Sequence, residues 1–205
     1  ERNMPRFIYI SKTDEENSDY NATFEALREK YGNKIAPVVV PIWNEGKKVT
    51  GIIDVLNKRA YEMQNGKRVE IDIPEGKEAV ITEFNDALKE SVAETSEEFM
   101  DKFFGGEDFT YAEMIQGLRQ GVRELSLFPV LCGSAVNTMG SLMLMDYIVD
   151  LLPNPMEGNY HKATRQDGET EPFVVSPGGV PTAFVFKTVS DQYGKYSYIQ
   201  VLSGV

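Results

Sequence analysis

A strand-loop-helix pattern occurs twice in the sequence, once near residue 10 and again near residue 130. The first copy is a β-branched and aromatic run over residues 5–10 that ends in the polar turn 11–14. The second copy, residues 127–132, ends at residues 133–135 and precedes a helix predicted from about Ser141 to Leu152. Strands that are followed by loops and helices build α/β proteins, so the pattern predicts an α/β fold.

The residues between the two copies carry other patterns. The apolar run 35–42 contains Pro37 and Pro41, which predicts a strand at or next to a sheet edge, because proline cannot donate to a strand ladder. Two further strand-like runs flank Asn65-Gly66, a strong signal for a two-residue hairpin, so a small antiparallel sheet is predicted. From Glu75 onward the apolar spacing becomes helical.

The first helix predicted in this stretch is amphipathic. Its apolar face consists of Ile81, Phe84, Leu88 and Val92. Its opposite face consists of acids at the same spacing, Glu83, Asp86, Glu90 and Glu94. Two shorter helices follow, with capping boxes predicted at Thr95 with Glu98 and at Thr110 with Glu113.

The net charge of the chain is concentrated in this same stretch. The sequence contains 21 Lys and Arg against 32 Asp and Glu, a formal charge of -11. From Glu70 to Glu113 there are 14 acids and 3 bases, an excess of 11 that equals the excess of the whole chain. This charge argues against a free nucleic-acid-binding module with a basic face. The middle of the chain is interpreted as a separate module with its own electrostatic task, or as a solvated face.

The rare residue types exclude several kinds of site. The single cysteine, Cys132, excludes an intrachain disulfide and a cysteine-based zinc cluster, and the single histidine excludes a histidine-based relay. We predict no catalytic and no metal-ligating residue in this chain. No apolar run approaches the ~20 residues of a membrane helix, and no signal peptide is present, so we expect a cytoplasmic protein that does not enter membranes. We also expect a piece of a longer protein, monomeric or weakly associating.

The end of the sequence predicts a linker and part of another module. Residues 156–180 are rich in Gly, Pro and polar side chains, which is typical of a linker. Two strand-like runs then surround Tyr193-Gly194. Because two strands alone are marginally stable, we interpret them as the start of a larger sheet.

The loops Ser11-Lys12-Thr13-Asp14 and Gly133-Ser134-Ala135 resemble the two guanine-reading loops of P-loop GTPases, N-K-x-D and S-A-K. The resemblance to bacterial elongation factor G and its elongation-factor-G-like paralogues extends along almost the whole chain, through MPRFIYISKTDEENSDY, LFPVLCGSAVNTMGSLMLMDYIVDLLPNP and PTAFVFKTVSDQYGKYSYIQVLSGV. It implies the C-terminal half of a P-loop GTPase domain (1–34 and 128–155) with an inserted α+β subdomain called G prime (35–127). After the linker 156–180, residues 181–205 would be the first strands of a β-barrel, domain II.

The same resemblance assigns guanine binding to Ser11, Lys12, Asp14, Ser134 and Ala135. In that arrangement an Asp carboxylate accepts hydrogen bonds from N1 and N2 of guanine, which adenine cannot donate. A Lys stem lies against the base, and the N–H after the Ser meets the guanine O6. Ser11 stands where the family normally has Asn, and this shorter side chain is expected to weaken guanine affinity.

The parts that bind phosphate are absent from this sequence. It contains no G-x-x-x-x-G-K-[ST] phosphate loop, no D-x-x-G and no candidate switch Thr to hold magnesium. In the family these elements lie N-terminal to the matching region. We therefore expect the parent protein to use GTP or GDP with magnesium, and this chain alone neither to hydrolyse GTP nor to bind it tightly.

The resemblance also implies a role on the ribosome. The parent would bind the ribosome, contact ribosomal RNA and use GTP hydrolysis to drive translocation. The face with Glu83, Asp86, Glu90 and Glu94 would dock the lysine-bearing C-terminal domain of the ribosomal stalk protein, although the same pattern also fits a solvated helix face. Three alternatives stay open: a tetracycline-resistance-type ribosomal protection GTPase, a ribosome-recycling paralogue, and a non-enzymatic acidic adapter that binds a basic protein.

Overall fold

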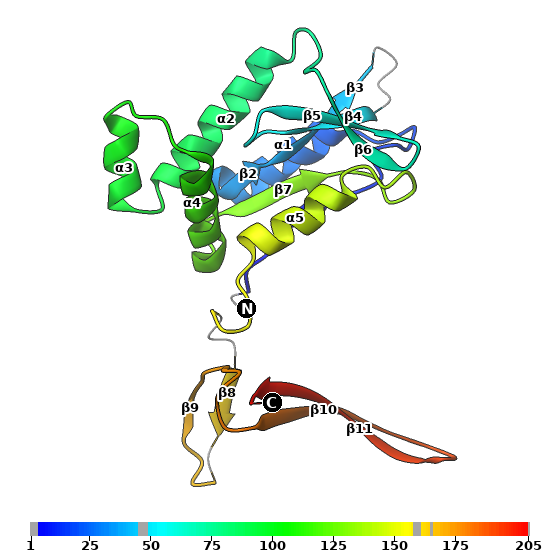
Figure 1. Cartoon of the computed structure of the whole chain (residues 1–205), viewed down its shortest axis with the longest axis vertical. Coiled ribbons are helices and arrows are strands. Elements are labelled where there is room, and N and C mark those ends of the chain that lie inside the picture. Colours follow the sequence, from blue (N-terminus) through cyan, green and yellow to red (C-terminus); the bar gives the residue numbers. More distant parts are fainter. Residues whose placement is uncertain (1–3, 45–48, 158–160, 165, 205) are drawn as a thin grey trace. The chain divides into compact units, whose positions relative to one another are not determined.

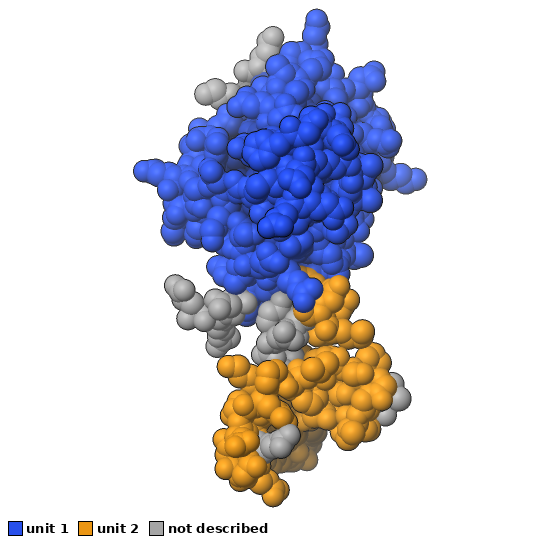
Figure 2. Space-filling view, turned by 90° about the vertical axis from the view of Figure 1, so that its left-hand side faces the viewer, with its two compact units in different colours: residues 1–152 blue, residues 153–205 orange. Residues whose placement is uncertain are grey.

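The structure, a computed structural model, describes residues 4–44, 49–157, 161–164 and 166–204. The chain forms two compact units, Glu1–Leu152 and Pro153–Val205 (Figure 2). The elements are, in chain order, β1 (Ile8–Ile10), α1 (Tyr20–Tyr31), a 3-10 turn (Gly32–Lys34), β2 (Ile35–Pro37), β3 (Val39–Trp43), β4 (Val49–Asp54), β5 (Arg59–Gln64), β6 (Lys67–Ile71), α2 (Glu78–Ala93), α3 (Glu97–Phe104), α4 (Tyr111–Glu124), β7 (Phe128–Cys132), α5 (Ser141–Leu151), β8 (His161–Thr164), β9 (Thr170–Phe173), β10 (Thr182–Asp191) and β11 (Gly194–Ser203).

The first unit contains a three-stranded parallel sheet in the order β1-β7-β2. Ile10 of β1 lies opposite Cys132 of β7, and Ile35 of β2 lies opposite Phe128 of β7. In Figure 1 this sheet lies between α1 above it and α5 below it. The α/β fold predicted from the repeated strand-loop-helix pattern is confirmed.

A four-stranded antiparallel sheet in the order β3-β4-β5-β6 follows directly after β2. Val38 joins the two sheets, because its N–H donates to the Val130 carbonyl at 3.0 Å and its carbonyl accepts from the Val55 N–H at 3.1 Å. Residues 35–37, predicted as the start of the insertion, thus pair within the parallel sheet. The antiparallel sheet begins at Val39, directly after the joining residue Val38.

The prolines and the Asn-Gly turn that were predicted to interrupt or join strands occupy the expected positions. β2 and β3, which contain Pro37 and Pro41, are the outer strands of their sheets in the part of the chain that the structure describes. Asn65 and Gly66 form the turn between β5 and β6 with φ of 51° and 75°, the positive values that a type I′ hairpin turn requires. The predicted antiparallel hairpin is therefore confirmed.

Aromatic side chains of α1 connect the parallel sheet to the inserted elements. Phe24 meets Phe84 of α2 edge-on with 5.9 Å between ring centroids, and Tyr20 meets Trp43 of β3 at 6.2 Å. Tyr20 and Phe24 are themselves buried and stacked at 5.7 Å. Because these contacts cross the predicted domain boundary, the insertion and the parallel sheet share one hydrophobic core.

The capping box predicted at Thr110 is present at the start of α4. The Thr110 N–H donates to the Glu113 carboxylate at 2.7 Å, and the Glu113 N–H donates to the Thr110 hydroxyl at 3.3 Å. Lys102 donates to the same carboxylate at 2.7 Å. Lys102 first, and then the two Thr110 donors, lower the pKa of Glu113 from 4.5 to about 2, so this carboxylate is charged near neutral pH.

The other predicted capping box is wrong. Ser96, and not Thr95, caps α3 and accepts from the Phe99 N–H at 3.2 Å. The Thr95 hydroxyl donates instead to the Val92 carbonyl at 2.6 Å, and the Thr95 N–H donates to the same carbonyl at 3.0 Å, because Thr95 lies just past the last turn of α2.

The second unit contains two antiparallel pairs, β8-β9 and β10-β11. The prediction of a plain linker over residues 156–180 misses the β8-β9 pair, in which the hydroxyls of Thr164 and Thr170 lie 3.0 Å apart across the strands. Gly168, one of the glycines of this stretch, lies between the two strands with φ of 91°. The strands predicted around Tyr193-Gly194 are confirmed as β10 and β11. In the part of the chain that the structure describes, no helix is long and apolar enough to cross a membrane.

Candidate functional site

The two loops singled out from the sequence lie side by side. β1 and β7 are adjacent and parallel, so the residues that follow each strand emerge at the same edge of the sheet. The Gly133 N–H donates to the Ile10 carbonyl at 3.1 Å, and the Thr13 N–H donates to the Gly133 carbonyl at 3.3 Å. Two backbone hydrogen bonds therefore connect Gly133 to the end of β1 and to the first loop, which are far apart from it in the sequence.

The first loop buries Thr13 and leaves the side chains before it, Ser11 and Lys12, exposed. Lys12 adopts a left-handed φ of 60°, and its side chain is exposed. Thr13 is buried, and its carbonyl accepts from the Ser18 hydroxyl at 3.0 Å. Asp14 is half-buried, and its carboxylate has no hydrogen-bond or ion-pair partner among the residues that the structure describes. The carboxylate is thus free to accept hydrogen bonds from a ligand.

The second loop is ordered by its own hydrogen bonds. Ser134 is fully buried; its N–H donates to the Met139 carbonyl at 2.9 Å, and its hydroxyl accepts from the Val136 N–H at 3.2 Å. Ala135 is exposed, and its N–H donates to no other described residue. The loop therefore presents one free backbone donor, at Ala135, next to the buried Ser134.

Three residues support the second loop: Gly133, which belongs to the predicted loop motif, and Tyr9 and Asn137, which were not identified from the sequence. The Tyr9 hydroxyl of β1 donates to the Met139 carbonyl at 3.4 Å. A Cβ on Gly133 would lie 2.1 Å from the Met139 oxygen and 2.2 Å from the Tyr9 hydroxyl, so only glycine fits there. Asn137 accepts from the Met139 N–H at 3.0 Å through its side chain. The signal available in the sequence was local: a glycine at a strand end and an asparagine in a tight turn.

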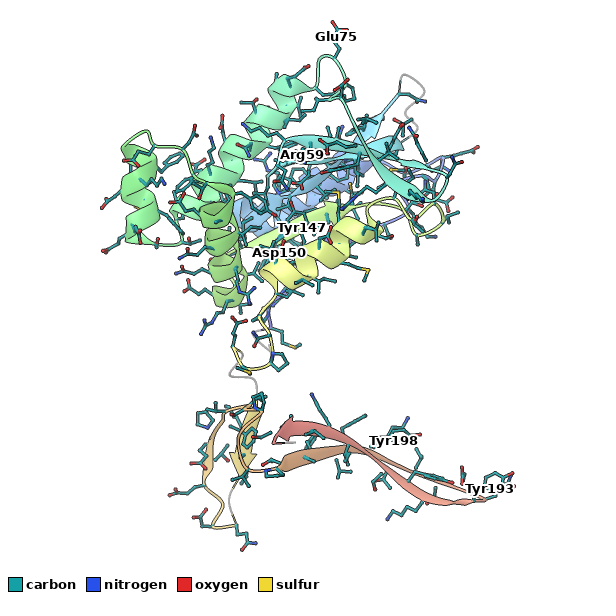
Figure 3. The ribbon with its side chains drawn as sticks, in the orientation of Figure 1. Arg59, Glu75, Tyr147, Asp150, Tyr193 and Tyr198 are labelled. Carbon is teal, nitrogen blue, oxygen red and sulfur yellow. The ribbon has the colours of Figure 1, made fainter. Side chains whose placement is uncertain are left out.

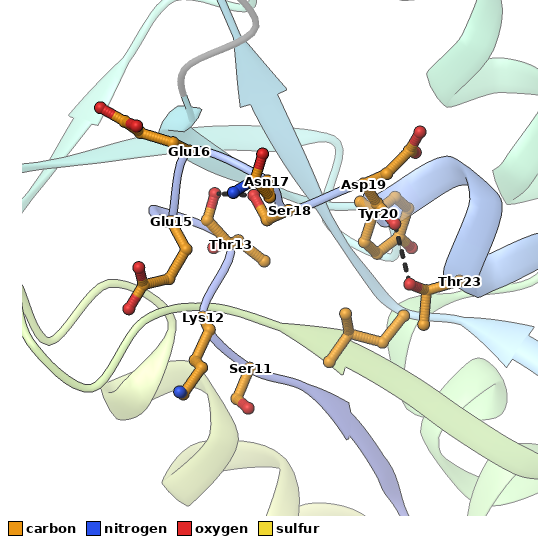
Figure 4. A pocket seen from close by; sticks show the side chains of 11 residues that line it. Ser11, Lys12, Thr13, Glu15, Glu16, Asn17, Ser18, Asp19, Tyr20 and Thr23 are labelled. Atoms are coloured by element: carbon orange, nitrogen blue, oxygen red, sulfur yellow. Dashed lines mark hydrogen bonds between the residues drawn. The ribbon is translucent and has the colours of Figure 1, made fainter.

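An open pocket of about 560 Å³ lies between the first loop and the start of α1 (Figure 4). Residues 10–13, 15–20 and 23 line this pocket. It includes Ser11 and Lys12, whereas Asp14, Ser134 and Ala135 are not among its lining residues. The predicted guanine-binding residues are thus neighbours through the backbone but do not share one cavity.

The charge of the pocket limits what it can bind. Three acids, Glu15, Glu16 and Asp19, and one base, Lys12, line it. Asp19 also caps α1, because its carboxylate accepts from the Ala22 N–H at 2.9 Å. An excess of carboxylates repels phosphate, so this part of the chain suits an uncharged hydrogen-bonding ring and not a phosphate group.

The acidic residues predicted for partner binding are all exposed. Glu83, Asp86 and Glu90 lie on α2, and Glu94 is the residue at its C-terminal cap. Lys89 lies 3.6 Å from the Asp86 carboxylate and donates to Asp108 at 2.7 Å, so it compensates part of this charge. The last turn of α2 contains no basic residue. Within the described residues, no group of three or more side chains could hold a metal ion.

Comparison with known proteins identifies similar chains. The chain is 33% identical, over an alignment of 217 residues, to an elongation factor G-like protein of Thermotoga maritima, with 100% of this chain covered. It is similar in fold to a crystal structure of a protein from Thermus thermophilus, with a TM-score of 0.79 and 29% identity over 98% of this chain and 27% of that one. No family model matches. The chain spans only about 29% of the length of the Thermotoga protein.

Proposed function

Since the chain is homologous over its whole length to part of an elongation-factor-G-like protein, we propose that it belongs to a ribosome-associated translational GTPase and supplies the guanine-reading loops. In this proposal Asp14 accepts from N1 and N2 of the base, the Ala135 N–H donates to O6, and the Lys12 stem covers one face. The buried Ser134 orders the second loop, and the exposed Ser11 lies beside Lys12 at the base site.

One observation carries this proposal: the hydrogen-bonded junction between the two loops. Thr13 and Gly133 are joined by a backbone hydrogen bond of 3.3 Å, and each loop also carries an unused polar group close to this junction. The Asp14 carboxylate supplies acceptors, and the Ala135 N–H supplies a donor. Guanine offers the matching pattern on one edge, two N–H donors next to a carbonyl acceptor.

The segments of this chain correspond to parts of a GTPase, and the phosphate-binding parts are assigned to the rest of the parent protein. We propose that residues 1–37 and 128–155 are half of the nucleotide-binding domain, 38–127 the G-prime insertion, and 181–205 the start of domain II. The magnesium ion and the phosphates of GTP or GDP would be held by residues of the parent protein that this sequence does not contain. The parent would contact ribosomal RNA and drive translocation.

Base selectivity tests the proposal directly. We expect this chain to bind GMP with a Kd of about 1 mM, because two hydrogen bonds to a charged group contribute a few kcal/mol, and to bind AMP at least about tenfold more weakly. Titration of ¹⁵N-labelled protein would report the site, with amide shifts at Asp14 and Ala135. Equal responses to GMP and AMP would contradict guanine reading and would favour the non-enzymatic adapter.

A second function is supported by the acidic face of α2. Glu90 and Glu94 lie at the C-terminal end of the helix, where the helix dipole is already negative and no basic residue compensates it. This arrangement lowers helix stability, and a lysine-bearing partner would relieve the repulsion. We propose that Glu83, Asp86, Glu90 and Glu94 dock the C-terminal domain of the ribosomal stalk protein.

Charge reversal tests this docking. The double variant Glu83→Lys with Glu90→Lys is expected to slow association with the stalk domain about tenfold at low salt, with a smaller difference at about 0.5 M salt. Glu25→Lys with Glu29→Lys, two exposed acids of α1, makes the same change in net charge elsewhere. Stopped-flow association rates that fall equally in both variants would contradict a specific contact on α2.

A further inference from the structure

Helix α3 carries an exposed apolar face that the functions above do not use. Phe104 is 79% exposed and Met100 is 39% exposed, and their spacing of four places them on the same side of the helix. Glu97 and Asp101 lie on the same side and are also exposed. In Figure 1 α3 lies at the outside of the first unit, beyond α2 and α4.

The opposite side of α3 already anchors it to the protein. Phe99 is buried and meets Phe109 edge-on at 5.7 Å. Lys102 forms its ion pair with Glu113 of α4 at 2.7 Å. Because these contacts fix the helix, Phe104 is not needed to hold it in place. The Phe104 ring meets the neighbouring Phe103 ring at 5.9 Å and lies outside the buried core of the first unit.

The charge around this face is uncompensated. The stretch from Glu70 to Glu113 has only three bases, and each is engaged elsewhere. Lys77 lies 4.8 Å from the centre of the Trp43 ring, Lys89 pairs with Asp108, and Lys102 pairs with Glu113. Neither Glu97 nor Asp101 has an ion-pair partner among the residues that the structure describes.

We propose that this face of α3 is a docking site for a basic protein surface that has an apolar socket for the Phe104 ring. Aromatic side chains that fill a pocket, surrounded by charged rims, are the usual source of affinity in such contacts. A second copy of this chain is a poor occupant, because each copy carries a formal charge of -11. Nucleic acid and anionic lipid surfaces would be repelled by Glu97 and Asp101.

The inference deepens the proposed binding of the stalk domain, rests on that proposed function and uses the domain as its probe. The α2 face has acids but only small apolar side chains, Ala79, Val80 and Ala87, among its exposed residues. It therefore suits fast electrostatic association, whereas an inserted aromatic ring slows dissociation. Changes on the α2 face should therefore alter mainly the association rate constant, and changes on the α3 face mainly the dissociation rate constant.

The test is surface plasmon resonance of this chain with the purified stalk C-terminal domain. Phe104→Ala is expected to raise the dissociation rate at least about tenfold, equally at low and high salt, because an apolar anchor is lost. Phe104→Leu should recover part of this loss. Val149→Ala, a residue of α5 that is 75% exposed, removes a similarly exposed apolar side chain and should bind like the wild type. Circular dichroism melting should be unchanged in all three variants.

The outcomes separate this inference from the proposed function. If Glu83→Lys with Glu90→Lys slows association while Phe104→Ala dissociates like Val149→Ala, the α3 site is overturned and the α2 site stands. If the wild type does not bind the stalk domain at all, both docking proposals fail. A tenfold faster dissociation of Phe104→Ala alone supports the α3 site.

Discussion

An Asp14→Asn variant of this chain is expected to prefer XMP over GMP. The Asp14 carboxylate has no partner among the described residues, so the substitution changes the site without breaking an internal contact. An Asn side chain still accepts from N1 of the base, but its amide group now faces the N2 donors of guanine. Xanthine has a carbonyl oxygen at that position, which the same amide group can donate to.

The expected size of the change is large. Loss of one hydrogen bond to a charged group and a new donor-donor conflict weaken GMP binding, while XMP gains a hydrogen bond. Together these effects shift the ratio of GMP to XMP affinity by about 100-fold. Competition titrations followed by ¹⁵N amide shifts would measure this ratio in wild type and variant.

A neighbouring carboxylate provides the control for this experiment. Glu15 is exposed and lies next to Asp14 in the same loop, so Glu15→Gln makes the same change from carboxylate to amide. It should leave the ratio of GMP to XMP affinity unchanged. An unchanged ratio in Asp14→Asn as well would assign Asp14 to the loop structure and not to base reading.

Asp54→Ala is expected to lower the free energy of unfolding by about 3 to 5 kcal/mol. Asp54 is buried, and its carboxylate accepts from the N–H groups of Leu56 and Asn57, both at 3.1 Å, from the Asn57 side chain at 2.7 Å and from the Tyr147 hydroxyl at 2.7 Å. Removal of the carboxylate leaves several donors without an acceptor, and the Tyr147 hydroxyl among them is buried.

Loss of the Asp54 carboxylate should also loosen the contact between the antiparallel sheet and α5. Asp54 ends β4 of the antiparallel sheet, and Tyr147, labelled in Figure 3, belongs to α5, which follows the second loop. Urea unfolding would measure the free energy, and hydrogen exchange would report the release of α5. Tyr147→Phe removes only one donor and should cost about 1 to 2 kcal/mol.

An exposed aspartate gives the matched comparison for stability. Asp72→Ala, at a residue that follows β6, should change the free energy of unfolding by less than about 0.5 kcal/mol. If Asp54→Ala were no more destabilising than Asp72→Ala, the hydrogen bonds of the Asp54 carboxylate, including the one from Tyr147 of α5, would contribute nothing to the stability of this unit.

Features that depend on neighbouring residues were predictable from the sequence. The Asn65-Gly66 turn, the Thr110 capping box and the prolines of the outer strands each involve residues within a few positions of each other. The two wrong predictions, the cap of α3 and the linker over residues 156–180, also concerned local conformation. Thr95 and Ser96 are both good capping residues, and only the end of α2 decides which of them caps α3. The β8-β9 pair was missed because four-residue strands give a weak pattern.

The sequence by itself thus determined the α/β class, the position of the two loops after their strands, and the acidic character of the middle of the chain. Only the tertiary structure decided which groups meet. The Tyr9 hydroxyl supports a carbonyl 130 positions away, and Asp54 binds a tyrosine 93 positions away. The tertiary structure also leaves the Asp14 carboxylate and the Ala135 N–H without a hydrogen-bond partner among the described residues, and it leaves Phe104 exposed. Periodicity and turn chemistry describe local conformation, whereas these contacts depend on strand order and packing, which bring distant residues together.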